Sequence, residues 1–445
     1  MKANTLTMAA MVLAAATLLL GGCKKEDEKI KYVTQELRFD LPEDLTDVTS
    51  ASINLLVLKN LNTAEEYNIM QPMVATSQSK PHINGALYAS KTAEPLRVKV
   101  TVPEGLYNIT MEGVVLQPGA AGLRASNIKA YAENVSITES DVALGSKTLT
   151  AFVSKNINSD GGWLIAEIFF AGTETPEGKQ YTGDKYFRIY NNSNDTLLAD
   201  GLCIAESALL SNGKNDYTPD PINSGNFPAA AIYRVPIGVN HRVAPGESIL
   251  LVDNAIDHTA ANSNSFNLTK ADYEWYDESS NPNVLDVDNP DVPNMEKIYC
   301  YTATIWGPTV QGNRAYALCR LGNDEANQLG AEQYVADYKQ IYSYDFYHPS
   351  TGEFIRTMEF DYWNIPHSWI LDAVNCCPST VWEWNLFPPQ LDMGYTYVAS
   401  TGQDKTRYGK SVRRKVQHGK ILQDTNNSGE DFLTAQTANP YYQFH

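Results

Sequence analysis

Apolar residues in this chain recur in short runs of strand length that turn-forming residues separate, and this pattern constrains the fold more than any other feature. Leu96–Val102 alternates apolar and polar residues with a period of two, as a strand with one buried face requires. Pro103-Glu104-Gly105 then predicts a turn into Tyr107–Met111, so we expect these two runs to form a hairpin. Further strand-like runs in this part of the chain lie at 36–41, 53–58, 135–137 and 149–153. We find no convincing helix between them, which favours an antiparallel β-sandwich.

The distribution of tryptophan predicts a second domain. The chain contains 7 tryptophans, all from Trp163 onward, whereas the region before residue 155 is dominated by Val, Ile, Leu and Thr. Asn156–Gly162 is rich in Asn, Ser, Asp and Gly and reads as a linker. We therefore expect one domain at 31–155 and another at 160–440. The fold class that follows is all-β, with two consecutive immunoglobulin-like sandwiches.

The N-terminus has the features of an export signal. Lys2 precedes an apolar run, Met8–Leu20, that is shorter than the roughly 20 residues needed to cross a bilayer. Leu20-Gly21-Gly22-Cys23 then resembles the lipobox of bacterial lipoproteins. The resemblance implies cleavage of residues 1–22 and lipidation of Cys23, although an ordinary secretory signal with a chance cysteine is the alternative.

The charged residues behind Cys23 suggest where the protein is exposed. Lys24-Lys25-Glu26-Asp27-Glu28 is similar to the export tag of Bacteroidetes lipoproteins that reach the outer face of the outer membrane. Residues 23–30 would then form an acidic tether. The membrane is the expected partner through the lipid anchor, because several acyl chains together give stable anchoring.

The second region resembles the lamin-tail domain, a compact immunoglobulin-like sandwich. The resemblance rests on the order of an apolar strand ending in Glu-Ile, an aromatic strand ending in Tyr-Asn, a Leu-rich strand, a Pro-Gly turn and an apolar strand. These segments are Trp163–Phe170, Lys185–Ser193, Leu197–Leu202, Pro245-Gly246 and Ser248–Val252. Ser411–Lys415 and Asp424–Phe432 are similar to closing elements of that fold. Residues 253–400 exceed a minimal lamin-tail domain and are expected to be a loop-rich insertion or extra strands, where a specialised function would lie.

The first region carries a weaker resemblance. Val100–Ile109 is similar to the strand-turn-strand of carboxypeptidase regulatory-like domains, which act mostly as spacers. Together with the lipobox and the lamin-tail elements, the chain resembles a Bacteroidetes family of surface lipoproteins.

Charge and cysteine content exclude some classes of protein. The formal net charge of -18 argues against nucleic acid as a partner, because phosphate binding needs a basic surface. The cysteines other than Cys23 are odd in number, so they do not form the framework of a small disulfide-rich protein. Cys300 and Cys319 lie in strand-like runs and would either pair across a sheet or stay as buried thiols. No second cluster with zinc spacing supports a metal or redox role for Cys376-Cys377.

Candidate ligand-binding residues lie among the aromatic and basic side chains. Tyr and Trp dominate binding hot spots, so Trp275, Tyr342, Tyr344 and Tyr347 are candidates, with a second hydrophobic core as the alternative. The basic segment around Arg413 and Arg414 would bind an anion, or would pair internally with Asp424, Glu430 and Asp431.

One acidic segment has the residue types of a calcium site. Asp286, Asp288 and Asp291 could supply oxygen ligands to Ca²⁺, but the glycine and distal glutamate of an EF-hand loop are missing. A solvated acidic loop is the alternative. No other cofactor is indicated.

The sequence carries no nucleophile elbow, zinc-protease motif, phosphate-binding glycine loop or dinucleotide fingerprint. This favours non-enzymatic ligand capture or adhesion at the cell surface, with a TonB-dependent β-barrel transporter as a possible partner by analogy. A carboxylate-based hydrolase of glycosidase type and a purely structural envelope protein are the alternatives.

Overall fold

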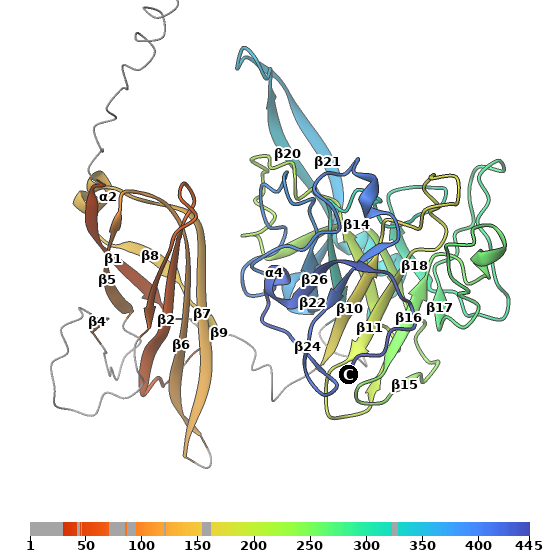
Figure 1. Cartoon of the computed structure of the whole chain (residues 1–445), viewed down its shortest axis with the longest axis horizontal. Helices are drawn as coiled ribbons and strands as arrows, with labels where there is room; N and C mark the ends of the chain where they lie inside the picture. The colour runs from red at the N-terminus through yellow and green to blue at the C-terminus, as the bar shows by residue number, and fades with distance from the viewer. Residues whose placement is uncertain are drawn as a thin grey trace, which may run out of the picture. The chain divides into compact units, whose positions relative to one another are not determined.

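The computed structural model describes residues 30–41, 45, 47–70, 85–86, 95–119, 122–153, 162–322 and 328–445. The signal peptide, Cys23, most of the acidic tether and most of the predicted linker lie outside these residues. Packing divides the chain into two compact units, one formed by residues up to 125 with 130–151, the other by 126–129 with 152–445. Both are built of β-sheets with few helices, which confirms the all-β fold class (Figure 1). Within the described residues, no helix is long and apolar enough to span a bilayer.

The first unit contains two sheets. One has the order β4-β5-β1-β8, with bounds Gly85–Ala86, Leu96–Pro103, Tyr32–Asp40 and Lys147–Thr150. The other has the order β3-β2-β6-β7-β9, with bounds Glu66–Met70, Ser50–Asn60, Gly105–Gly119, Gly122–Ile137 and Phe152–Val153; of these strands, β9 and residues 126–129 of β7 are grouped with the second unit. Burial alternates along β1, β5 and β6, as the period-two pattern predicts, and the buried positions form the core.

The predicted hairpin between Leu96–Val102 and Tyr107–Met111 is wrong. β5 pairs with β1, whereas β6 pairs with β2 in the other sheet, so the turn carries the chain across the core. Tyr107 stabilises this corner by donating its hydroxyl to the carbonyl oxygen of Pro103 at 2.6 Å. A Cβ atom at Gly105 would lie 2.9 Å from Nδ2 of Asn60, so a larger residue there would displace the Asn60 side chain.

A short helix, α2 (Glu139–Leu144), interrupts the strands of the first unit, where the sequence reading expected none. The backbone N–H of Asp141 donates to Oγ1 of Thr138 at 3.3 Å, and Oδ2 of Asp141 accepts from the N–H of Thr138 at 3.0 Å. This reciprocal pair is a capping box, and Thr138-Glu139-Ser140-Asp141 carried a signal that would have predicted it.

The second unit is a larger sandwich. Its six-stranded sheet has the order β17-β16-β11-β10-β23-β26, with bounds Tyr273–Glu274, Ser248–Val252, Tyr186–Asn191, Trp163–Phe169, Lys410–Arg414 and Phe432–Thr437. Its seven-stranded sheet has the order β20-β21-β14-β13-β19-β22, with β18 also pairing with β14. The bounds of these strands are Lys339–Tyr347, Phe354–Pro366, Asn226–Arg234, Cys203–Ser207, Ala315–Cys319, Ile370–Asn375 and Glu296–Cys300.

Smaller elements complete this unit. Two short pairs join β12 (Leu197–Leu198) to β15 (Arg242–Val243) and β24 (Val416–His418) to β25 (Ile421–Leu422). The helices are α3 (Ala331–Asp337), α4 (Ser428–Asp431) and three 3₁₀ turns, η1 (His258–Ala260), η2 (His367–Trp369) and η3 (Lys405–Arg407).

The main core lies between the two sheets of the second unit. Residues meeting there from both sheets include Ile165, Phe187, Leu251, Tyr233, Tyr316 and Val374. A second cluster covers the outer face of the seven-stranded sheet with Tyr334 of α3 and with Trp384, Leu386 and Phe387. Because both faces are covered, β10, β11, β13 and β19 are buried along their whole length. This explains why their sequences are nearly continuous apolar runs.

The segment 253–400 is an integral part of the sandwich. It supplies β19, which pairs directly with β13, and β22, which pairs with β19. Of the two possibilities weighed for this segment, extra strands describe it better than a loop-rich insertion does. Only part of it projects from the sandwich, as described below.

Arg414 connects the two sheets of this unit. It ends β23 in the six-stranded sheet, and its Nη2 donates to both carboxylate oxygens of Asp372 on β22, at 2.9 and 2.7 Å. Its Nε donates to the carbonyl oxygen of Ile165 at 3.0 Å, while the N–H of Ile165 donates to Asp372 at 2.6 Å. Arg414 and Asp372 therefore bridge the sheets and also satisfy the backbone of β10 where it bulges.

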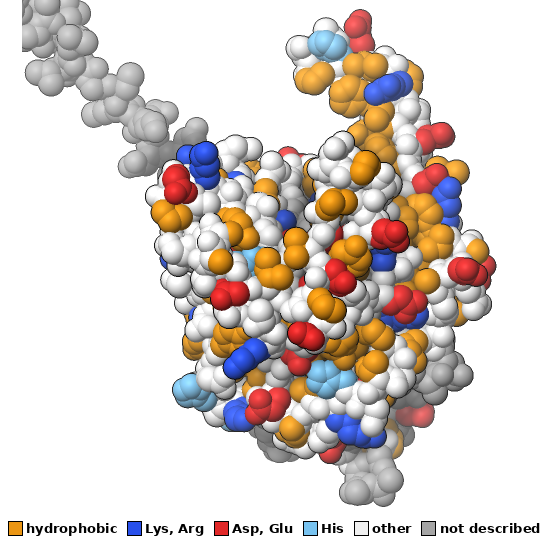
Figure 2. Space-filling view, turned by 90° about the vertical axis from the view of Figure 1, so that its right-hand side faces the viewer, with side chains coloured by type: hydrophobic (Ala, Val, Ile, Leu, Met, Phe, Trp, Pro, Cys, Tyr) orange, Lys and Arg blue, Asp and Glu red, His pale blue; other side chains and the backbone are white. Residues whose placement is uncertain are grey.

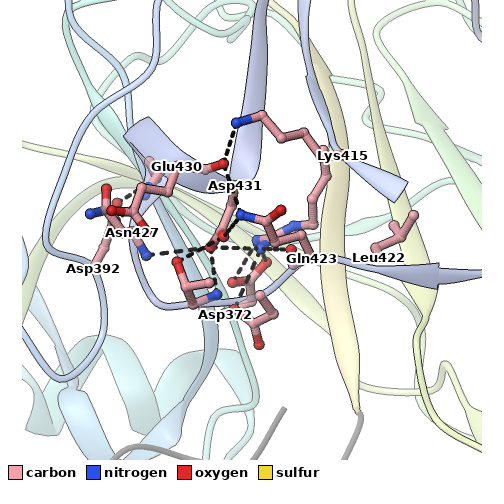
Figure 3. A network of polar contacts seen from close by, with 12 residues as sticks. Asp372, Asp392, Lys415, Leu422, Gln423, Asn427, Glu430 and Asp431 are labelled. Atoms are coloured by element: carbon pink, nitrogen blue, oxygen red, sulfur yellow. Dashed lines mark hydrogen bonds and ion pairs between the residues drawn. The ribbon is translucent and has the colours of Figure 1, made fainter. Parts of the chain in front are cut away.

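Further carboxylates lie near the same guanidinium. Figure 3 shows the polar network to which Asp372, Gln423 and Asp431 belong. Nη1 of Arg414 lies 3.4 Å from Asp424 and 3.5 Å from Asp431. Asp431 also accepts the N–H of Thr425 at 2.8 Å, which fixes the loop before α4. Burial raises the pKa of Asp372 to about 6, and the positive charge of Arg414 opposes that shift. The internal pairing weighed for this basic segment is therefore observed for Asp424 and Asp431, whereas Glu430 contributes its carbonyl oxygen to Lys415 and the main partner of Arg414, Asp372, was not foreseen.

Replacing Arg414 with Met should destabilise the second unit by about 3 to 5 kcal/mol, because buried carboxylates would lose their cation. The measurement is unfolding in guanidinium chloride followed by tryptophan fluorescence, which reports on this unit alone since all 7 tryptophans lie from Trp163 onward. Exposed Arg242 provides the matched control, and Arg242→Met should change the free energy of unfolding by less than about 0.5 kcal/mol. Equal effects of the two substitutions would show that the bridge is unimportant.

Candidate functional site

Several residues predicted to bind a ligand are enclosed in the core. Trp275 is fully buried between the sheets, and Tyr342 is fully buried with its hydroxyl donating to Oδ1 of Asn364 at 2.9 Å. Arg413 and Arg414 are also buried, each in an ion pair. The prediction of an open binding surface is therefore wrong for these four residues, whose rings and charges are used in packing.

The predicted calcium ligands do not converge. Asp286 accepts the backbone N–H groups of Asp277 and Val287, and Asp288 accepts from Nδ2 of Asn294 at 2.9 Å. Asp291 lies exposed. Among the residues that the structure describes, no group of three or more His, Cys, Asp or Glu side chains is arranged to hold a metal ion. The carboxylates of Asp286 and Asp288 instead accept hydrogen bonds from nearby residues of the same segment.

The cysteines of the second unit are free thiols. Cys319 lies opposite Cys203 in the sheet register, whereas Cys300 is on β18, so the two do not form the disulfide considered above. Cys376 and Cys377 are buried, and the first belongs to the main core.

The remaining candidates, Tyr344 and Tyr347, lie on a long β-hairpin formed by β20 and β21, which we call the arm. It projects beyond the rest of the second unit (Figures 1 and 2). β20 and β21 pair from Lys339↔Trp363 to Tyr347↔Phe354, but β21 pairs with β14 only over Trp363–Pro366. At the free edge of β20, Ser343 forms an isolated bridge with Thr218. The part of the arm beyond this bridge is a two-stranded ribbon.

One face of the arm is aromatic. Tyr344 stacks on Phe360 with 5.8 Å between ring centroids, and Phe360 stacks on Tyr362 at 5.7 Å. Tyr217, from the loop beside the arm, contacts Tyr344 edge-on at 5.2 Å. These half-buried rings attach the base of the arm to the sandwich.

The opposite face of the arm carries its charged pairs, with Ile341 exposed among them. Lys339 pairs with Asp361 at 2.8 Å, and Oγ1 of Thr357 donates to Asp345 at 2.7 Å. Side chains on a strand alternate between faces, so the arm is an amphipathic ribbon.

Large apolar side chains become exposed toward the tip of the arm. The exposed fractions are 39% for Phe346, 51% for Tyr347, 57% for Phe354 and 47% for Ile355. Tyr347 contacts the ring of Phe354 with 5.9 Å between centroids. Figure 2 shows hydrophobic side chains along the projecting arm. Phe346 and Tyr347 are adjacent on β20 and therefore point to opposite faces of the arm, so both faces of the tip expose apolar surface, as interaction sites often do.

The turn at the tip is well ordered by local hydrogen bonds. The N–H of His348 donates to the carbonyl oxygen of Glu353 at 2.8 Å, and the N–H of Gly352 donates to that of His348 at 2.9 Å. Gly352 adopts a φ of 69°, which favours glycine. The tip therefore presents its apolar residues from a defined turn.

Sequence reasoning missed the arm as a unit. Tyr342, Tyr344 and Phe346 on one side of Pro349-Ser350-Thr351-Gly352 alternate with period two, as do Met358, Phe360 and Tyr362 on the other. This symmetrical pattern around a turn is a hairpin signal. The pattern does not show where the supporting sheet ends. It therefore could not distinguish Tyr342, which is buried, from the exposed residues at the tip.

Comparisons with known proteins agree with this fold. A family model described as "Protein of unknown function (DUF4876)" matches residues 244–439, which include the arm and Arg414. The crystal structure of a DUF4876 family protein from Bacteroides thetaiotaomicron VPI-5482 is 18% identical to this chain, with a TM-score of 0.50. The similarity covers 92% of this chain and 96% of that one. A search among curated proteins found no match. The chain is thus similar to a Bacteroidetes family of unknown function, and at this identity the structural likeness shows the fold alone.

Proposed function

We propose that this protein is a lipid-anchored protein of the cell surface that recognises another macromolecule, without catalysis, through the tip of the arm. The observation that carries the proposal is the exposure of Phe346, Tyr347, Phe354 and Ile355 at the end of the arm, beyond the rings that attach its base to the sandwich. A partner that covers these side chains would recover the free energy lost by leaving them in water.

The energetics of the arm support a binding role. A two-stranded ribbon without a supporting sheet is only marginally stable in water, and each of its edges carries unpaired backbone groups. The sandwich core does not need the tip, because the aromatic contacts that attach the arm end near Tyr344. A projection of this kind suits insertion into a pocket or groove of a protein partner.

Anchoring at Cys23 would place the arm outside the cytoplasm. Support comes from the lipobox-like Leu20-Gly21-Gly22-Cys23 and from the acidic residues behind it. An outer-membrane β-barrel, such as a TonB-dependent transporter, is the partner we propose to seek first, by analogy with other surface lipoproteins. Adhesion to another cell or to a matrix protein is the alternative within the same mechanism.

The role of the arm can be tested by capturing partners from outer membranes solubilised in mild detergent. The double variant Phe354→Ser/Ile355→Thr should reduce recovery of the main partner at least tenfold, which corresponds to about 1.4 kcal/mol or more of binding free energy. Exposed substitutions of this kind should change the stability of the fold by only about 0.5 kcal/mol.

The matched control replaces an exposed apolar pair elsewhere in the same unit. Val284 and Leu285 are 41% and 71% exposed, so Val284→Thr/Leu285→Ser removes similar surface without touching the arm. This control should recover the partner as the unaltered protein does. If the arm variant also does so, the tip is not the binding site.

Lipidation can be tested separately with Cys23→Ser. The substitution removes the thiol that accepts the lipid, so the protein should leave the membrane fraction and should no longer incorporate labelled fatty acid. Retention in the membrane fraction with unchanged labelling would refute anchoring at this cysteine, whatever the arm binds.

A further inference from the structure

A pocket on the second unit lies apart from the arm, on the outer face of the six-stranded sheet. Its volume is about 460 Å³, within the range of small-molecule sites. Its floor includes Arg188 and Tyr190 of β11, and residues 440–445 line it from the chain's last segment. We call this segment the C-terminal strap.

Arg188 at the pocket wall is a buried cation without an ionic partner. It is only 7% exposed, and no described carboxylate lies within ion-pair distance of its guanidinium. It donates to the carbonyl oxygen of Tyr442 in the strap and to Oγ of Ser248 at 2.5 Å, while its Nε has no hydrogen-bond partner. Buried charges are almost always paired, so an unpaired arginine at a pocket indicates an anion site.

The nearest acid, Glu167, acts on Arg188 through its charge without forming an ion pair with it, and one of its two carboxylate oxygens is engaged with other groups. Glu167 lies opposite Arg188 in the sheet register, but its Oε1 accepts from Nη2 of Arg413 at 3.0 Å and from the hydroxyls of Tyr186 and Ser411. Two arginines therefore flank one glutamate in a row across β11, β10 and β23. The row carries one surplus positive charge, which an anion in the pocket would neutralise.

The other charged groups of the pocket define what kind of anion fits. Lys270 is exposed at the wall and has no partner among the described residues, while Lys420 pairs with Glu247 at 3.1 Å. Asp272 also lines the pocket and accepts the N–H of Leu250 at 2.8 Å. Two carboxylates at the wall disfavour a doubly charged phosphate but can accept hydrogen bonds from hydroxyl groups.

Aromatic side chains complete the lining. Tyr190, Tyr441 and Phe444 contribute rings, and Tyr441 is held in place by donating its hydroxyl to the carbonyl oxygen of Asn267 at 2.7 Å. The guanidinium of Arg188 lies 4.9 Å from the centroid of the Phe444 ring. Rings beside charged and hydroxyl-accepting groups suit a ligand that has both an apolar face and several hydroxyls.

We infer that this pocket binds an acidic sugar of one or two rings, with its carboxylate directed to Arg188 and Lys270. Its hydroxyls meet Asp272 and Glu247, and a ring face packs on Tyr441. The pocket and the arm share no residue, so this inference stands apart from the role proposed for the arm.

The test is titration calorimetry of the purified full chain with glucuronic acid, glucose and inorganic phosphate. Glucuronic acid should bind at one site per chain, and glucose and phosphate should each bind at least tenfold more weakly. Lys270→Gln should weaken glucuronic acid binding about tenfold, because it removes an exposed cation without disturbing the core. The control Lys214→Gln changes an exposed lysine outside the pocket and should leave binding unchanged.

Four other results would contradict the inference. Equal binding of glucose would refute the anion site, and tighter binding of phosphate would refute the sugar. No binding of glucuronic acid, or equal binding by the Lys270→Gln variant, would refute the site itself. The arm variant Phe354→Ser/Ile355→Thr should bind glucuronic acid normally, so failure here and failure of the proposed arm function are distinguishable.

Discussion

The ion pair between Arg414 and Asp372 is the interaction on which the second unit depends, because it joins β23 of the six-stranded sheet to β22, the edge strand of the seven-stranded sheet, beside a core of apolar side chains. Enclosing a guanidinium there requires partners for all of its donors, and the carbonyl oxygens of Ile165 and Gln423 supply those that carboxylates do not. The loop that carries Asp424 and Asp431 is consequently tied to the same point. These contacts fix the distance between the two sheets at this point, and so they help to position the outer faces of both sheets.

The two proposed sites follow from how those surfaces are covered. The central strands β13 and β19 of the seven-stranded sheet are buried on both faces, whereas β20 and β21 run past β14 and become the arm. The outer face of the six-stranded sheet is covered by the C-terminal strap, whose Tyr442 and Phe444 rings lie over Arg413 and Arg188. The gap that the strap leaves beside Arg188 is the pocket. Packing alone does not explain the exposed apolar residues at the tip of the arm. Nor does it explain Arg188, a buried cation without an ion pair, at the pocket.

The sequence predicted the strands well where packing is regular. Trp163–Phe170 and Ser248–Val252 were read correctly because strands covered on both faces need continuous apolar runs. It failed where two arrangements satisfy the same pattern, as at Pro103-Glu104-Gly105, where alternation fits a hairpin and a corner between sheets equally. Tyr342 and Tyr347 lie on the same strand in similar sequence surroundings. Tyr342 is buried because it lies near the supporting sheet, and Tyr347 is exposed because it lies at the tip. Adjacent Arg413 and Arg414 point to opposite faces of β23, so no linear pattern could assign them one role. The pocket was invisible because Arg188, Lys270 and Tyr441 meet only in the folded chain.

The central claim is that the tip of the arm contacts a partner on the cell, and the most direct test is crosslinking in living cells. A photoreactive amino acid placed at Tyr347, which is 51% exposed, should give a discrete crosslinked product that mass spectrometry can identify. The same residue placed at Tyr301, which is 65% exposed on the body of this unit, should not give that product. Identical products from the two positions, or none from Tyr347, would contradict a binding role for the arm.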